Sequence, residues 1–115
     1  MSINAILAGA GAFASRKPIP KLVNLPTADG EMECQLYFLD LPASDVRELL
    51  SGEGREKDEQ FVCQTLCNED GSLALKMEGE HGASSLKLRT LRAIVAGALE
   101  ALGLDTKARD EAKKD

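Results

Sequence analysis

The segment Glu31–Phe38 alternates strictly between polar and apolar residues, and it constrains the fold more than any other part of the chain. The side chains of a β-strand point in turn to two opposite faces, so a period of two is typical of a strand buried on one side. The sequence therefore predicts a half-buried strand here. Its expected buried face is formed by Met32, Cys34, Leu36 and Phe38.

A turn sequence lies directly before this strand. The residues Thr27 to Gly30 (TADG) favour a tight turn, and Gly30 can adopt a positive φ. A short apolar run that includes Leu22, Val23 and Leu25 precedes the turn and follows two prolines. Together these features predict an antiparallel β-hairpin over residues 19–41.

A short helix is expected after the hairpin. Ser44 can cap its N-terminus, and the acidic Asp45 suits the first turn because the N-terminal end of a helix dipole is positive. Gly52 and Gly54 are expected to end the helix. Its apolar face consists of Val46, Leu49 and Leu50.

A second helix is expected to begin near Arg55–Asp58 and to run to Cys67, where the turn Asn68–Ser72 closes it. Cys63 and Cys67 would then lie one turn apart, and two thiolates at that spacing can share a metal. A zinc site needs further ligands, which leaves Cys34 and His81 as the soft ligands in the chain.

All three cysteines fall at or beside apolar positions, where free cysteine packs as a small hydrophobe. We therefore expect reduced, inert thiols in a reducing compartment, and no metal or other cofactor. A metal- or redox-linked regulatory domain built on these four residues is the alternative.

The longest predicted helix spans Leu86–Leu102, with Ser84 or Ser85 as its cap and Gly103 as its C-terminal stop. Apolar residues recur along it at i, i+3, i+4 and i+7, which is the pattern of an amphipathic helix. It also carries small residues, which either pack within the domain or allow another helix to approach closely. These are Ala93, Ala96, Gly97, Ala98 and Ala101.

The expected fold class is α+β: a small N-terminal antiparallel β-hairpin packed with about three helices. The 115 residues suit one domain. Residues 19–104 are expected to form it, preceded by a flexible segment, 1–18, and followed by a charged, disordered tail, 105–115.

Charge and composition exclude several function classes. The net charge is −5 with no dense basic stripe, so binding to nucleic acid or to anionic lipid is not expected. The apolar run near the N-terminus lacks a preceding positive region and is too short to span a bilayer, so neither a signal peptide nor a membrane anchor is expected. No nucleophile, acid–base pair or phosphate loop has a recognisable pattern, so we do not expect an enzyme.

The order of these segments resembles that of the small tail assembly chaperones of long-tailed (lambda-like and related) phages and prophages. The stretch L-P-A-S-D-V-R-E-L-L matches the first short helix of the family, L-C-N-E-D-G-S-L-A-L its acidic-Asp-Gly turn, and A-L-E-A-L-G-L-D the end of its final helix. The resemblance covers roughly residues 19–104. It departs at Leu73–Gly79, where the family has an acidic segment that contains Phe.

The resemblance implies a function in viral tail morphogenesis through protein–protein interaction in the host cytoplasm. Proteins of this family coat the long, apolar, helical tape measure protein, keep it soluble and help to recruit tail tube subunits. A longer frameshifted product is a further feature that the resemblance implies. A homo-oligomer is expected from the composition instead, because a chain with so few aromatic residues has a thin core that self-association could complete.

The expected partner-binding surface comprises exposed apolar positions on the first and last predicted helices, because those helices carry an excess of small and apolar residues. These positions are Val46, Leu49, Leu50, Leu88, Leu91, Val95, Leu99 and Leu102.

Overall fold

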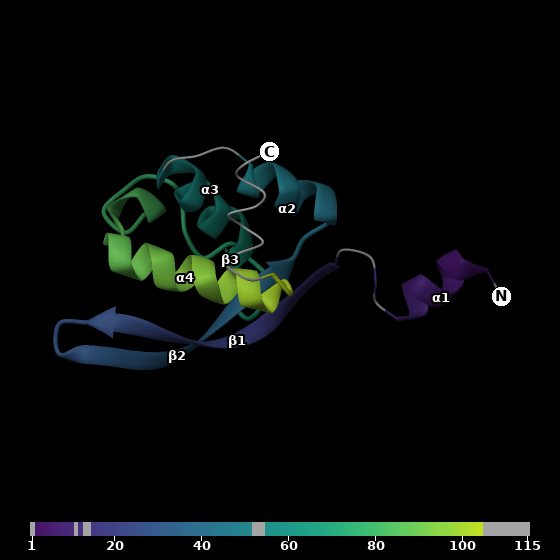
Figure 1. Ribbon diagram of the computed structural model, residues 1–115, viewed down its shortest axis with the longest axis horizontal. Coiled ribbons are helices and arrows are strands. Elements are labelled where there is room, and N and C mark those ends of the chain that lie inside the picture. The colour runs from purple at the N-terminus through teal and green to yellow at the C-terminus, as the bar shows by residue number, and fades with distance from the viewer. Residues whose placement is uncertain (1, 11, 13–14, 52–54, 105–115) are drawn as a thin grey trace.

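The computed structural model describes residues 2–10, 12, 15–51 and 55–104 (Figure 1). Its three strands form one antiparallel sheet in the order β1-β2-β3, and this confirms the α+β class with an N-terminal hairpin. The elements in chain order are α1 (Ile3–Gly9), β1 (Ser15–Thr27), β2 (Gly30–Asp40), α2 (Ala43–Leu50), α3 (Arg55–Thr65), β3 (Leu66–Cys67), the 3-10 helix η1 (Ala83–Ser85) and α4 (Leu88–Ala101).

The hairpin is longer than predicted, because β1 begins at Ser15 and not near residue 19. Its register runs from Thr27 opposite Gly30 to Ser15 opposite Asp40, with an irregularity between Ser15 and Pro18. The predicted turn is confirmed: two residues connect the strands, and Gly30 has a φ of 142°.

Burial along the inner face of β2 decreases toward the turn of the hairpin. Phe38 is fully buried, Leu36 and Cys34 are half-buried, and Met32 is exposed. The turn end of the hairpin extends beyond α4 (Figure 1), so none of the helices that the structure describes covers the sheet there. The prediction of a buried Met32 is therefore wrong, although the alternation itself places all four residues on one face.

One edge of the sheet is formed by β1, which contains three prolines. Pro18, Pro20 and Pro26 have the same parity along the strand, and proline has no N–H to donate to a neighbouring strand. These residues therefore lie at positions whose backbone groups point away from β2. Between Pro18 and Pro26, only Leu22 and Asn24 present an N–H to the outer edge.

The core lies between the sheet and α4, with α3 packed on α4 and α2 on α3. Helix α4 approaches β1 closely at Gly97, where an added β-carbon would lie 2.6 Å from Cγ2 of Val23. The absence of a side chain at Gly97 therefore allows β1 of the same domain to pack closely against α4, and this space is not available to a helix of another molecule. The core cluster consists of Val23, Phe38, Val46, Leu50, Phe61, Val62, Leu66, Leu91, Ile94, Val95, Ala98 and Leu99.

Helix α2 begins at Ala43, so the prediction of Ser44 as its cap is wrong. Pro42 occupies the N-cap position, and its carbonyl accepts from the backbone N–H groups of Asp45 and Val46, both at 3.1 Å. Asp45 lies in the first turn, as predicted. Gly52 and Gly54, the expected end of the helix, lie outside the described residues.

Helix α3 ends at Thr65, so the prediction that it continues to Cys67 is wrong. The Thr65 hydroxyl donates to the carbonyl of Phe61 at 2.7 Å, and the chain then becomes extended. Leu66 and Cys67 pair with Phe38 and Tyr37 as the third strand. Cys63 and Cys67 consequently lie on different elements, and not one turn apart on a helix.

The segment Asn68–Ser72 forms a tight turn between two extended stretches, and does not end a helix. Its backbone is closed by Asn68 N–H to the carbonyl of Ser72 at 2.8 Å, and Cys67 bridges to Leu73. Gly71 has a φ of 91°, a conformation that favours glycine.

Helix α4 begins two residues later than predicted. Lys87 occupies its N-cap position without a side-chain bond, while the Ser85 hydroxyl donates to the carbonyl of Gly79. The predicted stop at Gly103 is confirmed. Gly103 has a φ of 81°, and its N–H and that of Leu104 donate to the carbonyls of Glu100 and Leu99, which is a Schellman motif.

In the described part of the chain, no helix is both long and apolar enough to cross a membrane.

Candidate partner-binding surface

The eight apolar residues predicted to contact a partner divide into two groups by burial. Leu88 is 49% exposed, and Leu49 and Leu102 are half-buried, so these three can reach a partner. The remaining five belong to the core, because α4 and α2 turn their apolar faces toward the sheet and α3. The prediction of exposure is therefore wrong for Val46, Leu50, Leu91, Val95 and Leu99. Partner contact at the other three positions stays a prediction.

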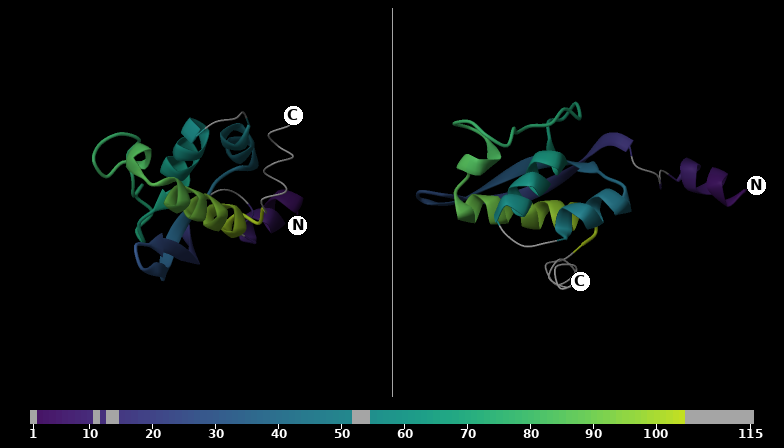
Figure 2. Two further views of the ribbon diagram at one scale, coloured as in Figure 1. Left: turned by 60° about the vertical axis from the view of Figure 1, so that its left-hand side comes forward. Right: turned by 90° about the horizontal axis from the view of Figure 1, so that it is seen from above.

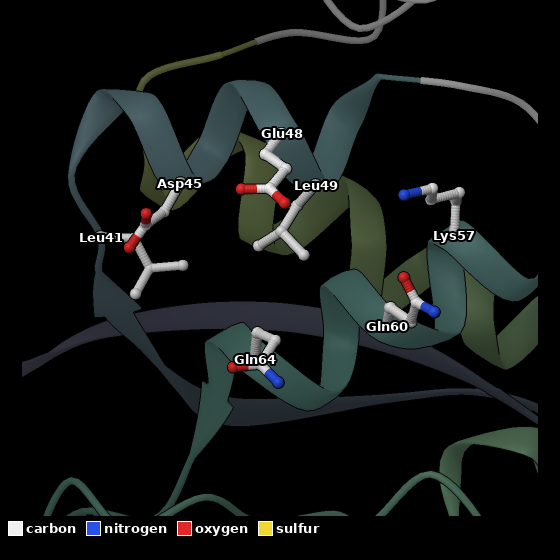
Figure 3. Close-up of a pocket in the computed structure, with 7 residues that line it drawn as sticks. All are labelled: Leu41, Asp45, Glu48, Leu49, Lys57, Gln60 and Gln64. Carbon is white, nitrogen blue, oxygen red and sulfur yellow. The ribbon is translucent and has the colours of Figure 1, made fainter.

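A hollow of about 270 Å³ lies between α2 and α3 (Figure 3) and is called the α2–α3 hollow. Leu41, which precedes α2, and Leu49 supply its apolar side chains. Polar side chains complete the lining. On each helix they are spaced three or four residues apart and therefore share one helix face. They are Asp45 and Glu48 from α2, and Lys57, Gln60 and Gln64 from α3.

The charges around the α2–α3 hollow are unequal. Two carboxylates, those of Asp45 and Glu48, lie on the α2 side, and one ammonium group, that of Lys57, lies on the α3 side (Figure 3). Among the described lining residues, the surface is therefore net acidic around two leucine side chains. Such a surface is complementary to an apolar side chain that is flanked by basic ones.

The volume of the hollow indicates what it can hold. Pockets for small molecules typically enclose about 300–1,000 Å³, so a hollow of about 270 Å³ is smaller than the usual ligand site. It has room for one or two side chains of a partner. Its open position between two helices suits a helix docked across it.

A second, larger hollow of about 450 Å³ lies on the other side of α2, against the end of α4, and is called the α2–α4 groove. Leu41 lines both hollows, which thus flank α2. The groove is mainly apolar, and its two charged residues are both exposed. It is lined by Ala12, Asp40, Leu41, Ala43, Val46, Arg47, Leu50, Leu102 and Leu104.

The three cysteines and His81 do not form a shared site in the described structure. Cys34 lies on β2, Cys63 on α3 and Cys67 on β3, and His81 is exposed. Within the described residues, no three His, Cys, Asp or Glu side chains are gathered where they could hold a metal ion. No observation therefore favours the metal- or redox-linked alternative.

The two thiols of the core are held in their neutral form. Burial raises the pKa of the Cys63 thiol, and the nearby Glu59 carboxylate raises it further, against a smaller lowering by a backbone hydrogen bond at Ala83. Burial and the charge of Asp70 likewise raise the pKa of Cys67. Because the thiolate is the reactive form, both side chains are poor nucleophiles.

Sequence reasoning missed most of the residues that line the two hollows. Leu41 could have been found, because it precedes the N-cap of α2 and Val46 lies four residues inside the helix, which is the spacing of a hydrophobic staple. The face of α3 with Gln60 and Gln64 has no distinctive pattern. Its role is visible only once α2 and α3 pack together.

Comparison with models of known protein families, with curated proteins and with solved structures gave no match.

Proposed function

We propose that this protein is a phage or prophage tail assembly chaperone. It binds the tape measure protein, keeps it soluble in the host cytoplasm and helps to recruit tail tube subunits. Two things support the proposal: the order of sequence segments that resembles this family, and the α2–α3 hollow. The hollow carries the proposal, because it offers a helical client a site of side-chain size in which two leucine side chains are surrounded by polar and charged ones.

The proposed contact follows from the shape and charge of the hollow. An apolar side chain of the client helix enters between Leu41 and Leu49, and basic side chains on adjacent turns lie near Asp45 and Glu48. Electrostatic attraction of this kind increases the association rate and selects among apolar helices. The client surface is thus expected to be amphipathic and basic beside its apolar stripe.

Two further features agree with a holding function. The prolines of β1 remove backbone N–H donors from its free edge, which disfavours strand addition there and agrees with a client bound through helix surfaces. The net charge of −5 favours a soluble complex once apolar client segments are covered.

The experiment is co-expression with the tape measure protein that the proposal expects to be encoded beside this chain, with the soluble yield of that protein as the measurement. We expect the chaperone to raise the soluble fraction of the tape measure protein and to co-purify with it. A tape measure protein that stays insoluble, with no complex recovered, would contradict the proposed function.

Two substitutions locate the contact. Glu48→Lys reverses an exposed charge at the hollow, and Leu49→Gln removes its apolar contact. We expect both to reduce the recovered complex at least about tenfold, which corresponds to about 1.4 kcal/mol of binding free energy. The matched control is Glu33→Lys, which makes the same charge change at an exposed position of the hairpin. Equal loss with Glu33→Lys would exclude the hollow as the contact.

A further inference from the structure

Helix α1 carries an apolar stripe that the described part of the chain does not cover. Ile3, Ile6 and Leu7 follow i, i+3, i+4 spacing and are 73%, 53% and 38% exposed. No residue of α1 is buried. Figure 1 and the right-hand view of Figure 2 show that α1 projects away from the sheet and the other helices.

An isolated helix of this kind needs a surface to pack on. It has seven residues, whereas helices in water are marginal below about 12–15 residues. The first 15 residues of the chain contain no Asp, Glu, Lys or Arg, so no charged side chain hydrates the helix. A short, uncharged helix with an exposed stripe obtains most of its stability from packing that stripe.

The α2–α4 groove offers a surface of matching character close to the point where α1 joins the body. Ala12, two residues beyond the C-cap of α1, lines the groove. Leu50, Leu102 and Leu104 contribute apolar side chains, and Ala43 leaves room for close approach. The charged side chains of the groove, Asp40 and Arg47, are exposed and can remain in water when the groove is filled.

A backbone hydrogen bond joins the last turn of α1 to a residue that lines the groove. The backbone N–H of Ala12 donates to the carbonyl of Leu7 at 2.9 Å, which closes the last turn of α1 against the groove rim. With this bond in place, α1 extends away from the body (Figure 1), and no described residue of α1 itself lines the groove. The groove is thus open to the same helix from another molecule.

We propose that α1 of one copy docks into the α2–α4 groove of a second copy, with its stripe of Ile3, Ile6 and Leu7 against the leucines of the groove. Exchange of the two helices in both directions gives a closed two-fold dimer. This inference does not rest on the proposed function, because the α2–α4 groove and the α2–α3 hollow lie on opposite sides of α2.

Sedimentation velocity of the full chain tests the proposal. We expect the wild type to sediment at twice the mass of the 12.3 kDa chain. Ile6→Glu and Leu102→Glu are each expected to raise the dissociation constant of the dimer at least about tenfold. Leu22→Glu, at an exposed strand position outside α1 and the groove, is the matched control and leaves the dimer unchanged. Circular dichroism establishes that each variant is folded.

A mixing experiment distinguishes exchange between copies from folding back within one copy. One chain carries Ile6→Cys and the other Leu102→Cys, and peptide mass mapping locates the disulfide formed on mild oxidation. We expect a linked pair of chains joined at these two positions. A wild type that is monomeric at its highest soluble concentration overturns the proposal. A third protein carries both Ile6→Cys and Leu102→Cys on one chain. If the disulfide forms within this chain but not between the two singly substituted chains, the proposal is likewise overturned.

Discussion

Gly97 of α4 and Val23 of β1 are so close that a β-carbon at position 97 would lie 2.6 Å from Cγ2 of Val23. Real β-carbons do not approach other atoms to that distance, so Gly97→Ala requires the helix or the strand to shift. Overpacking costs about 1–3 kcal/mol, and the better helix propensity of alanine offsets up to about 1 kcal/mol. We expect the free energy of unfolding to fall by about 1–2 kcal/mol in urea titrations.

A double-mutant cycle isolates this contact. In a Val23→Ala background the crowding atom is absent, so Gly97→Ala is expected to be neutral or stabilising there. A Gly97→Ala protein that is as stable as the wild type would show that α4 and β1 do not approach so closely.

The C-terminal stop of α4 depends on the conformation of Gly103 and not on space around it. Its φ is 81°, and nothing lies within 4 Å of an added β-carbon. Gly103→Ala is therefore expected to lower the free energy of unfolding by about 1–2 kcal/mol, the cost of a left-handed conformation for an L-residue. Thermal unfolding followed by circular dichroism measures the change.

Gly9→Ala is the matched control for Gly103→Ala. Gly9 lies in α1, its β-carbon would also meet nothing within 4 Å, and its φ is not positive. We expect no loss of stability there. A loss equal to that of Gly103→Ala would mean that the positive φ is not the cause.

Asp70 makes the turn Asn68–Ser72 sensitive to pH. The Ser72 hydroxyl and backbone N–H donate to Oδ1 of Asp70 at 2.6 and 2.9 Å, and these bonds lower the pKa of Asp70 below its usual value of 3.8. A carboxylate with a lowered folded-state pKa contributes its full stabilisation above the unfolded-state pKa. That contribution is lost as pH falls through the folded-state pKa.

Asp70→Asn removes this pH dependence. We expect the wild type to be more stable than the variant at neutral pH, and the difference to shrink below about pH 4. The measurement is urea unfolding of both proteins between neutral and strongly acidic pH. A difference that grows as pH falls would have the opposite sign from the one these hydrogen bonds require.

The buried thiols are expected to resist modification in the folded protein. Cys63 and Cys67 are buried and have raised pKa values, so labelling by an alkylating reagent at neutral pH should be much slower than in urea. Mass spectrometry after timed alkylation distinguishes them from the half-buried Cys34. Rapid labelling of Cys63 in the native state would indicate a reactive thiol and revive the redox alternative.

Local signals in the sequence predicted the hairpin correctly. The alternation of Glu31–Phe38, the turn glycine at position 30 and the stop at Gly103 each depend on neighbours within a few residues. Their physical causes act over the same short range: side-chain periodicity in a strand and the freedom of glycine at positive φ.

Contacts between distant segments explain the predictions that were wrong. Leu66 and Cys67 leave the helical path to pair with β2, and this pairing follows from the position of a strand almost 30 residues earlier in the chain. The burial of Leu91, Val95 and Leu99 likewise depends on which face of α4 meets the sheet. The α2–α3 hollow exists only where two helices meet, so no single segment could reveal it.

The prolines of β1 also determine whether a partner at this edge is recognised through its main chain or through its side chains. A strand that adds to a sheet edge is held by main-chain groups that every sequence possesses, so such recognition is permissive. Here the edge between Pro18 and Pro26 offers main-chain donors at Leu22 and Asn24 alone. A partner that contacts this edge must instead be recognised by its side chains, and its amino-acid sequence thereby decides whether it binds there.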